Sequence, residues 1–382
     1  MKRVVLYLML GLLCFSCIQK EAANTEADIE TCVILNEHEQ PDPNIKGNVI
    51  ISNTRVIAQA TPIIDLTKLA LDVTLTEGAT ITPNPREVRD YSHPQSFVVT
   101  SEDGEWQKTY QVSVDTFDLP VKYTFELAEL NRDNKYYVFY ETIDGQGANF
   151  RQDIWASGNG GYSLTGVGKK PEDFPTVSVL EGKEGKGIKL ETKSTGGFGE
   201  MKHMPIAAGN MFIGNFDVAN ALKEPMKATR FGLPFGKKPK RMTGWYKAKR
   251  GKVLTDVGED GKAIPIEGQD TCDIYAVLYE SEGLEQGTLD GDNVLNSKNI
   301  VALARLENPE MHDPETDLST EGYIYFTEPF DYETYGNRFD IEKSRQYKYN
   351  LAVVFTSSIK GATFIGAVGS VLYVDEVQVI CE

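Results

Sequence analysis

Hydrophobic and polar positions in this chain alternate over short runs of strand length. Residues 110–114 (YQVSV) alternate apolar and polar side chains, and SEDG at 101–104 has the composition of a hairpin turn. Similar runs recur between residues 43 and 116. They predict a small immunoglobulin-like β-sandwich over 43–116, acting as a spacer, although the Cys…Trp…Cys pattern of true immunoglobulin domains is absent.

A second predicted unit covers residues 121–382, and the segment 115–121 with Pro120 marks the boundary before it. Strands are expected at 122–127, 177–180, 187–192, 241–248, 273–279, 300–306, 323–330, 349–356 and 372–380. Strands of this number with long glycine-rich connections predict a two-sheet jelly roll. The fold class expected for the whole chain is therefore all-β.

The first 17 residues, MKRVVLYLMLGLLCFSC, have the pattern of a lipoprotein signal peptide. Two basic residues precede an apolar run, and Ser16 and Cys17 supply the small residue and the lipidated thiol. Residues 18–42 are polar and acidic, which predicts a flexible tether. We therefore expect an exported outer-membrane lipoprotein, facing the periplasm or the cell surface and contacting the membrane only through its lipid.

Composition excludes several classes of function. The formal charge of −17 and the export signal argue against nucleic acid as a partner. Cys14 lies in the signal segment and Cys17 at its lipidation point, and the three remaining cysteines form no CxxC motif, so a zinc site is not indicated. Whether Cys32, Cys272 and Cys381 form a disulfide stays open. No two of the four histidines lie within ten residues of each other. A monomer is expected.

Several sequence blocks of the second unit occur in a characteristic order. They are FE at 125–126, WASGN at 155–159, AAGNMFIGN at 207–215, TRFGLPF at 229–235, GWYK at 244–247, DIYAVLY at 273–279, TSSIKG at 356–361, GAVGS at 366–370 and LYVD at 372–375. Together they resemble the putative carbohydrate metabolism domain, a family of lipoproteins from saccharolytic gut bacteria. The resemblance implies a jelly roll similar to carbohydrate-binding modules and to some glycanases.

A sugar-binding site needs an exposed flat aromatic ring beside hydrogen-bonding side chains. Trp245, Tyr246 and Lys247 provide this combination in three residues, with Trp245 and Lys247 on the same strand face. The alternative is that Trp245 belongs to the core.

Two further groups are candidates for the same chemistry. Trp155, Asn159 and Tyr162 lie in or beside a glycine-rich loop, where Trp155 could instead close one end of the sandwich. Asp273 and Tyr275 share a face of an apolar strand. The nine Lys and Arg residues between 229 and 252 are interpreted as a solvated face rather than as an anion site.

An enzyme would need two carboxylates about 5 to 10 Å apart across a glycosidic bond. Asp273 and Glu280 are the candidates, but their opposite parity on one strand prevents them from pairing with each other. No cofactor is required. Glu126 and Asp375, near the first and last strands, could hold a structural calcium ion as related jelly-roll modules do.

The function predicted from the sequence is that of a lipid-anchored protein that binds a polysaccharide or glycoconjugate and takes part in glycan utilisation. A glycoside hydrolase on the same fold is the first alternative. A structural or adhesion lipoprotein is the second.

Overall fold

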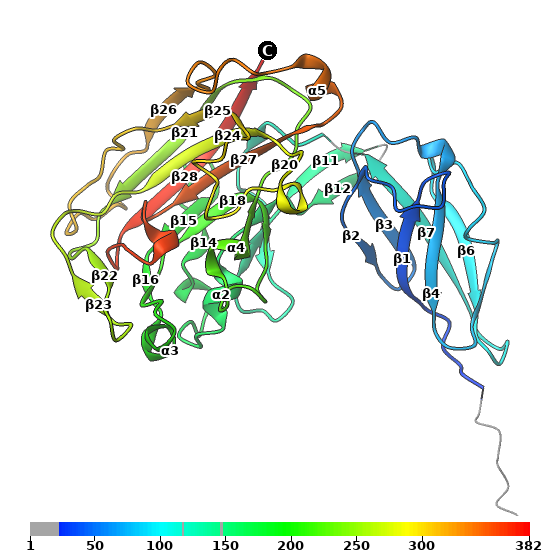
Figure 1. Ribbon diagram of the computed structural model, residues 1–382. Coiled ribbons are helices and arrows are strands. Elements are labelled where there is room, and N and C mark those ends of the chain that lie inside the picture. The colour runs from blue at the N-terminus through cyan, green and yellow to red at the C-terminus, as the bar shows by residue number, and fades with distance from the viewer. Residues whose placement is uncertain (1–22, 117, 146–147) are drawn as a thin grey trace, which may run out of the picture. The chain divides into compact units, whose positions relative to one another are not determined.

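The computed structural model describes residues 23–116, 118–145 and 148–382, and the chain divides into two compact units, 1–117 and 118–382 (Figure 1). The predicted signal peptide and Cys17 lie outside the described residues. Among the residues that are described, no helix is long and apolar enough to cross a membrane.

Unit 1 is a β-sandwich of two sheets. Its elements are β1 (Ile29–Leu35), β2 (Ile45–Ile51), β3 (Arg55–Ala60), η1 (Leu66–Lys68), β4 (Ala70–Leu75), β5 (Thr80–Thr82), β6 (Gln95–Thr100) and β7 (Gln107–Thr116). One sheet pairs β1 with β4, and the other has the order β2-β3-β7-β6-β5, with β3 and β7 parallel. The alternating residues of β7, Tyr110, Val112 and Val114, are buried in the core, as their period of two predicts.

The prediction of a flexible tether over 18–42 is wrong for its described part. Residues 29–35 form β1, and Ile29, Cys32 and Ile34 belong to the core of unit 1. Apolar residues at strand spacing within the polar segment account for this, since burying them offsets the entropy of ordering the chain.

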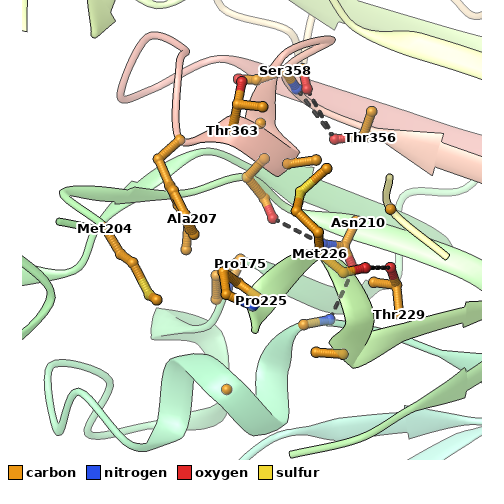
Figure 2. Close-up of a pocket in the computed structure, with 18 of the residues that line it drawn as sticks. Pro175, Met204, Ala207, Asn210, Pro225, Met226, Thr229, Thr356, Ser358 and Thr363 are labelled. Carbon is orange, nitrogen blue, oxygen red and sulfur yellow. Dashed lines mark hydrogen bonds between the residues drawn. The ribbon is translucent and has the colours of Figure 1, made fainter. Parts of the chain in front are cut away.

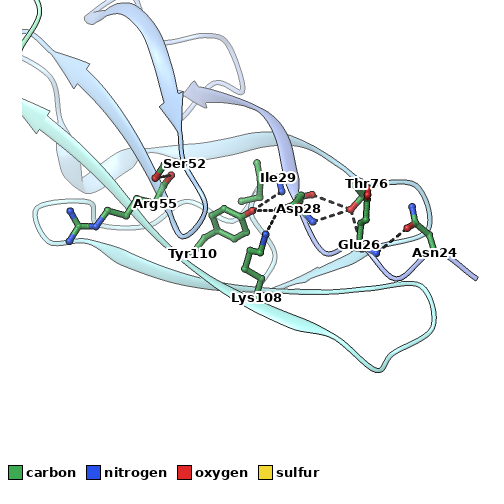
Figure 3. Close-up of polar contacts among 9 residues, drawn as sticks. All are labelled: Asn24, Glu26, Asp28, Ile29, Ser52, Arg55, Thr76, Lys108 and Tyr110. Atoms are coloured by element: carbon green, nitrogen blue, oxygen red, sulfur yellow. Dashed lines mark hydrogen bonds and ion pairs between the residues drawn. The ribbon is translucent and has the colours of Figure 1, made fainter. Parts of the chain in front are cut away.

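Polar contacts fasten the chain just before β1 (Figure 3). Asp28 forms an ion pair with Lys108 and accepts a 2.8 Å hydrogen bond from the Tyr110 hydroxyl, and its backbone N–H donates to Thr76 Oγ1 at 3.0 Å. The backbone N–H of Asn24 donates to Glu102 at 2.8 Å. Unit 1 therefore begins near residue 24 instead of residue 43.

Unit 2 is built from many strands and a few short helices. The strands are β8 (Lys122–Tyr123), β9 (Ala128–Leu130), β10 (Tyr137–Phe139), β11 (Glu141–Gly145), β12 (Ala148–Gln152), β13 (Trp155–Ala156), β14 (Thr176–Val179), β15 (Gly187–Glu191), β16 (Lys193–Ser194), β17 (Ile206–Ala207), β18 (Asn210–Phe216), β19 (Thr229–Phe231), β20 (Leu233–Pro234), β21 (Pro239–Lys249), β22 (Thr255–Val257), β23 (Ala263–Pro265), β24 (Asp273–Glu280), β25 (Ile300–Arg305), β26 (Ile324–Pro329), β27 (Tyr349–Thr356) and β28 (Val371–Cys381). The helices are α2 (Asn159–Ser163), η2 (Pro171–Asp173), α3 (Gly196–Met201), α4 (Pro225–Ala228), η3 (Glu285–Gly287), α5 (Ile341–Arg345) and η4 (Gly361–Thr363).

Two antiparallel sheets form the jelly-roll sandwich of unit 2 (Figure 1). The β24 sheet has the order β13-β18-β27-β24-β25, with β19 beside β18 and β20 beside β27. The β21 sheet has the order β14-β15-β28-β21-β26, and β8 pairs with β28. The all-β prediction is confirmed.

The main core lies between these sheets and takes one face of each. Ile274, Ala276 and Leu278 of β24 meet Tyr246 and Ala248 of β21 there. A second core of Phe212, Phe231, Tyr275, Val277 and neighbours covers the opposite, outer face of the β24 sheet. That sheet is therefore buried on both sides, whereas the outer face of the β21 sheet carries partly exposed side chains.

Candidate functional site

Aromatic side chains gather on the outer face of the β21 sheet. Trp245 on β21 lies opposite Tyr325 on the edge strand β26, and their ring centroids are 5.1 Å apart with planes tilted by 59°. Tyr325 is 52% exposed and Trp245 is partly exposed. The neighbouring residue Tyr246 points into the core, so strand alternation turns Trp245 outward. We call Trp245 and Tyr325 the aromatic pair.

A lysine lies over this pair. Lys183, in the hairpin between β14 and β15, places its Nζ 4.3 Å from the centroid of the Trp245 ring. A cation over an indole face is held by the negative potential of the ring. The pair therefore presents apolar ring surface and a charged hydrogen-bond donor side by side, which is the combination that a sugar ring with a hydroxyl rim requires.

The predicted role of Lys247 as a sugar contact is wrong, because its ammonium group is used within the fold. Its Nζ donates to the carbonyl of Leu318 at 2.7 Å and lies 4.9 and 5.1 Å from the ring centroids of Tyr323 and Tyr373. Burial lowers the pKa of Lys247. This lysine fastens the loop before β26 over the sheet.

Past Tyr373, the same face opens into a cavity of about 570 Å³. Charged residues on its walls include Lys189, Glu191, Lys249 and Asp317. Lys189 pairs with Glu191 at 2.7 Å, and Lys249 donates to the carbonyl of Thr316 at 3.0 Å. We call this cavity the β21 groove.

The loop candidates Trp155 and Asn159 are not available to a ligand. Trp155 is 8% exposed, packs 5.1 Å from the Tyr123 ring, and donates its indole N–H to Glu141 at 2.9 Å. Asn159 is fully buried and exchanges two hydrogen bonds with the backbone of Thr176, at 2.7 and 3.1 Å. Both side chains are taken up by the fold, which contradicts the prediction that they contact a sugar.

Tyr246 also has a structural position, contrary to its predicted role in binding. Its ring is buried in the core between the sheets, and its hydroxyl accepts a 2.8 Å hydrogen bond from the backbone N–H of Glu310.

The carboxyl group that accepts the Trp155 hydrogen bond is itself buried. Burial raises the pKa of Glu141 to about 7, although the Trp155 hydrogen bond lowers it.

Three of the predicted residues line a second cavity, of about 390 Å³, on the outer face of the β24 sheet. They are Tyr162, Asp273 and Tyr275. Asp273 receives two hydrogen bonds from Arg305, at 2.9 and 2.7 Å, and burial still raises its pKa against the lowering effect of that arginine. Figure 2 shows this cavity, with side chains of Met204 and Ala207 on one side and Met226 and Thr229 on the other. We call it the β24 cavity.

The candidate catalytic pair is not brought together. Asp273 lines the β24 cavity, whereas Glu280, at the other end of β24, forms an ion pair with Lys343. Seven residue steps of about 3.3 Å separate the two along the strand by roughly 23 Å, far more than a glycosidase pair allows. The expectation that they cannot act together is confirmed.

The carboxylates proposed for calcium both accept hydrogen bonds from the β14–β15 hairpin. The backbone N–H of Lys186 donates to Glu126 at 2.9 Å, and that of Glu184 donates to Asp375 at 3.0 Å. Burial raises the pKa of Asp375 to about 6, while backbone hydrogen bonds from Glu184, Glu376 and Lys183 lower it. No cluster of three or more His, Cys, Asp or Glu occurs in the described part of the chain. Calcium binding stays a prediction.

The three described cysteines, Cys32, Cys272 and Cys381, are free thiols.

Residues that the sequence reasoning missed include Tyr325, Tyr373 and the methionines Met204 and Met226. For Tyr325, the available signal was the alternation of Tyr323 and Tyr325 within YIYF, because residues two apart share a strand face. Nothing comparable marks the methionines, which lie on loops and short helices far apart in sequence.

Comparison with known proteins agrees with the architecture. Residues 124–380 match the family described as putative carbohydrate metabolism domain, and residues 40–114 match the one described as SGBP, N-terminal. No curated protein matches the chain.

Two solved structures are similar over long stretches. A putative glycoside hydrolase from Bacteroides thetaiotaomicron is 42% identical, with a TM-score of 0.69 and coverage of 95% of this chain and 99% of that one. A putative glycoside hydrolase from Bacteroides vulgatus is 34% identical, with a TM-score of 0.60 and coverage of 70% and 100%. The chain belongs to the family of the putative carbohydrate metabolism domain.

Proposed function

We propose that the protein binds a glycan on the outer face of the β21 sheet, as part of the recognition or utilisation of a polysaccharide. The observation that carries the proposal is the aromatic pair, Trp245 and Tyr325, with Lys183 beside it. This pair leaves apolar ring surface in water, because Tyr325 is exposed and Trp245 partly exposed, and the C–H face of a sugar would cover it.

The β21 groove supports an extended ligand. It continues the same sheet face past Tyr373 and is lined by both cationic and anionic side chains, which can exchange hydrogen bonds with sugar hydroxyls. A chain of several sugar units could lie on the aromatic pair with one unit and contact the groove with others. The match of residues 40–114 to SGBP, N-terminal is consistent with a glycan-binding role.

A glycan array followed by titration calorimetry tests the proposal. We expect Trp245→Ala and Tyr325→Ala each to weaken binding about tenfold or more. Tenfold corresponds to about 1.4 kcal/mol of binding free energy, and removal of an aromatic ring that anchors a ligand costs about this much or more. Trp106→Ala is the matched control, because Trp106 is the most exposed tryptophan described (63%) and belongs to unit 1.

Retained affinity in both aromatic variants would refute this site. Absence of binding by the intact protein to plant, host and microbial glycans would refute the function itself and favour a structural or adhesion role.

Glycoside hydrolysis is the second candidate, because both similar structures are described as putative glycoside hydrolases. In the β21 groove, Glu191 and Asp317 are the carboxylates to test. Release of reducing sugar from a bound polysaccharide, abolished in Glu191→Gln or Asp317→Asn while binding persists, would establish an enzyme. Binding without release would leave the binding function.

Lipid anchoring is also proposed, from the sequence pattern that ends at Cys17. Incorporation of labelled palmitate into the wild-type chain and its loss in Cys17→Ser would support an anchor. Equal labelling of the two would contradict it.

A further inference from the structure

The β24 cavity lies on the opposite outer face of the sandwich from the aromatic pair, and the proposed glycan site does not use it. It opens among α2, α3, α4 and η4, above the ends of β18, β24 and β27. Its volume of about 390 Å³ falls within the range of small-molecule pockets. The atoms that line the cavity lack dispersion contacts on that side, and an occupant would supply them.

The hydroxyl groups on its walls are already committed to the protein. The threonine hydroxyls of Thr165, Thr195, Thr229, Thr356 and Thr363 donate to backbone carbonyls 2.5–3.2 Å away. Ser358 donates to the buried carboxylate of Asp270 at 2.6 Å. The threonines therefore present methyl groups and spare acceptor lone pairs to the cavity, but no protons (Figure 2).

Few donors remain for a ligand. The hydroxyl of Tyr275 has no hydrogen-bond partner within the described ranges, although its ring is 5% exposed and lines the cavity. Asn210 uses its side-chain oxygen to accept from the N–H of Gly158 at 2.8 Å and gives one amide hydrogen to the carbonyl of Ala208 at 3.3 Å, which leaves a second hydrogen. Both carboxylate oxygens of Asp273 are bound by Arg305.

This inventory disfavours a free sugar. A hexose carries several hydroxyls, each of which loses water on entry and needs a partner to replace it. On the buried wall, the free donors of Tyr275 and Asn210 are too few to meet that need, and the remaining ammonium group, that of Lys360, belongs to an exposed side chain. An apolar ligand with one oxygen acceptor fits the same inventory without leaving groups unpaired.

The apolar walls favour an aromatic ring over an aliphatic chain. Met204 and Met226 contribute flexible thioethers from loop and helix, and Phe212, Phe216 and Phe231 contribute rings. Thioether sulfur makes favourable contacts with aromatic ring edges, and unbranched methionine adapts to the shape of a bound ring.

We infer that the β24 cavity binds a compact aromatic group carrying one oxygen acceptor, such as a benzoyl or phenolic ester, with the acceptor facing Tyr275 and Asn210. The ring could be free or attached to a sugar as an aryl substituent, since the cavity chemistry is the same for both. The inference is independent of the proposed glycan site.

Methionine methyl signals report on the cavity directly. The purified protein, with its methionine methyl groups labelled with carbon-13, is titrated with methyl benzoate, and each signal is assigned by substitution with leucine. We expect the signals of Met204 and Met226 to move together and saturably, while those of buried Met242 and exposed Met201 stay fixed. Movement of all four, or of none, would overturn the inference.

Variants locate the ligand within the cavity. Ala207→Phe places a ring where Figure 2 shows the side chain of Ala207 facing the cavity, and should weaken methyl benzoate binding at least about tenfold. Tyr275→Phe removes only the hydroxyl and should weaken it about threefold to tenfold. Trp245→Ala should leave it unchanged. Should Ala207→Phe fail to fold, the Tyr275→Phe result and the methionine signals still decide the matter.

Two further ligands complete the test. Phenyl β-galactoside that binds more tightly than methyl benzoate, with the same Tyr275 dependence, would identify a ring carried by a sugar; weaker binding would favour a free ring. Methyl β-galactoside that binds as tightly as methyl benzoate and is blocked by Ala207→Phe would show a sugar pocket instead, and would overturn the inference. None of these results depends on whether the aromatic pair binds a glycan.

Discussion

The two outer faces of the unit 2 sandwich differ in how they are covered. On the β24 sheet, seven of the eight residues of β24 and of β27 are buried, because a second core packs on the outer face. On the β21 sheet, outward residues such as Trp245 and Lys249 stay partly exposed. One sheet thus holds a partly covered cavity beneath long connections, and the other offers an open platform beside a groove.

The difference is visible in the strand sequences. DIYAVLYE and YNLAVVFT are nearly continuous apolar runs, as expected for strands buried on both faces, whereas PKRMTGWYKAK mixes charged and apolar residues. Strand composition therefore indicates which kind of site each face can carry. An open face suits long, hydroxyl-rich ligands, and a covered face suits small apolar ones.

The largest effect that separates the faces is on stability. Phe212→Ala, in the second core, should lower the free energy of unfolding by about 3–5 kcal/mol, because a buried ring is lost and the space it filled remains. Tyr325→Ala should change it by less than about 1 kcal/mol, since half of that side chain is in water. Urea denaturation of both variants measures the contrast. Equal losses would mean that the outer face of the β24 sheet is not a core.

A second contrast concerns the buried ion pair beneath the β24 cavity. Arg305→Gln leaves the Asp273 carboxylate buried without its cation, and should cost about 3 kcal/mol at pH 7. Burial already raises the pKa of Asp273 in the folded state, and removing the arginine raises it further. The folded variant then binds a proton that the unfolded chain releases above about pH 4.

The cost of Arg305→Gln should therefore be small near pH 4 and grow as the pH rises to 7. Unfolding free energies at several pH values test this, with Asp273→Asn combined with Arg305→Gln as the control that removes the charge. A penalty that does not vary with pH would show that the arginine acts through packing alone.

Much of the fold could be predicted from local pattern, and much of the site could not. The run 349–356 became β27 with the same bounds, because eight apolar-rich residues between polar segments specify a buried strand. The predicted strand 122–127 shortened to Lys122–Tyr123, since Phe125 adopts a positive φ of 54° that ends the pairing. Strand β18 was not expected, although its residues were noted as a family block.

Site residues failed where burial decides the role of a polar or aromatic side chain. Trp155, Tyr246 and Lys247 have the composition of a sugar site, yet partners distant in sequence, such as the Leu318 carbonyl, fix them inside the fold. Trp245 differs because it points to the outer face of the β21 sheet and stays partly exposed there, whereas Tyr246, opposite the same edge strand, points into the core. Such tertiary facts have no local sequence signal.

The smallest effect concerns the cation on the open face and rests on the proposed glycan site. Lys183→Met keeps the length of the side chain over Trp245 but removes its charge and its donors. We expect glycan affinity to fall about twofold to fivefold, corresponding to roughly 0.5–1 kcal/mol for one partly exposed cation contact. Stability should change by less than about 0.5 kcal/mol.

Lys202→Met is the matched control, because Lys202 is exposed just after α3, in the segment that borders the β24 cavity. Calorimetry with whichever glycan the array identifies separates two roles for Lys183. A loss confined to Lys183→Met means that the ammonium group reaches the bound sugar. A gain in affinity would mean instead that the lysine covers the Trp245 ring in the free protein and must move before a sugar can stack. The outer face of the β21 sheet would then be less accessible to a ligand than the exposed fractions of its rings suggest.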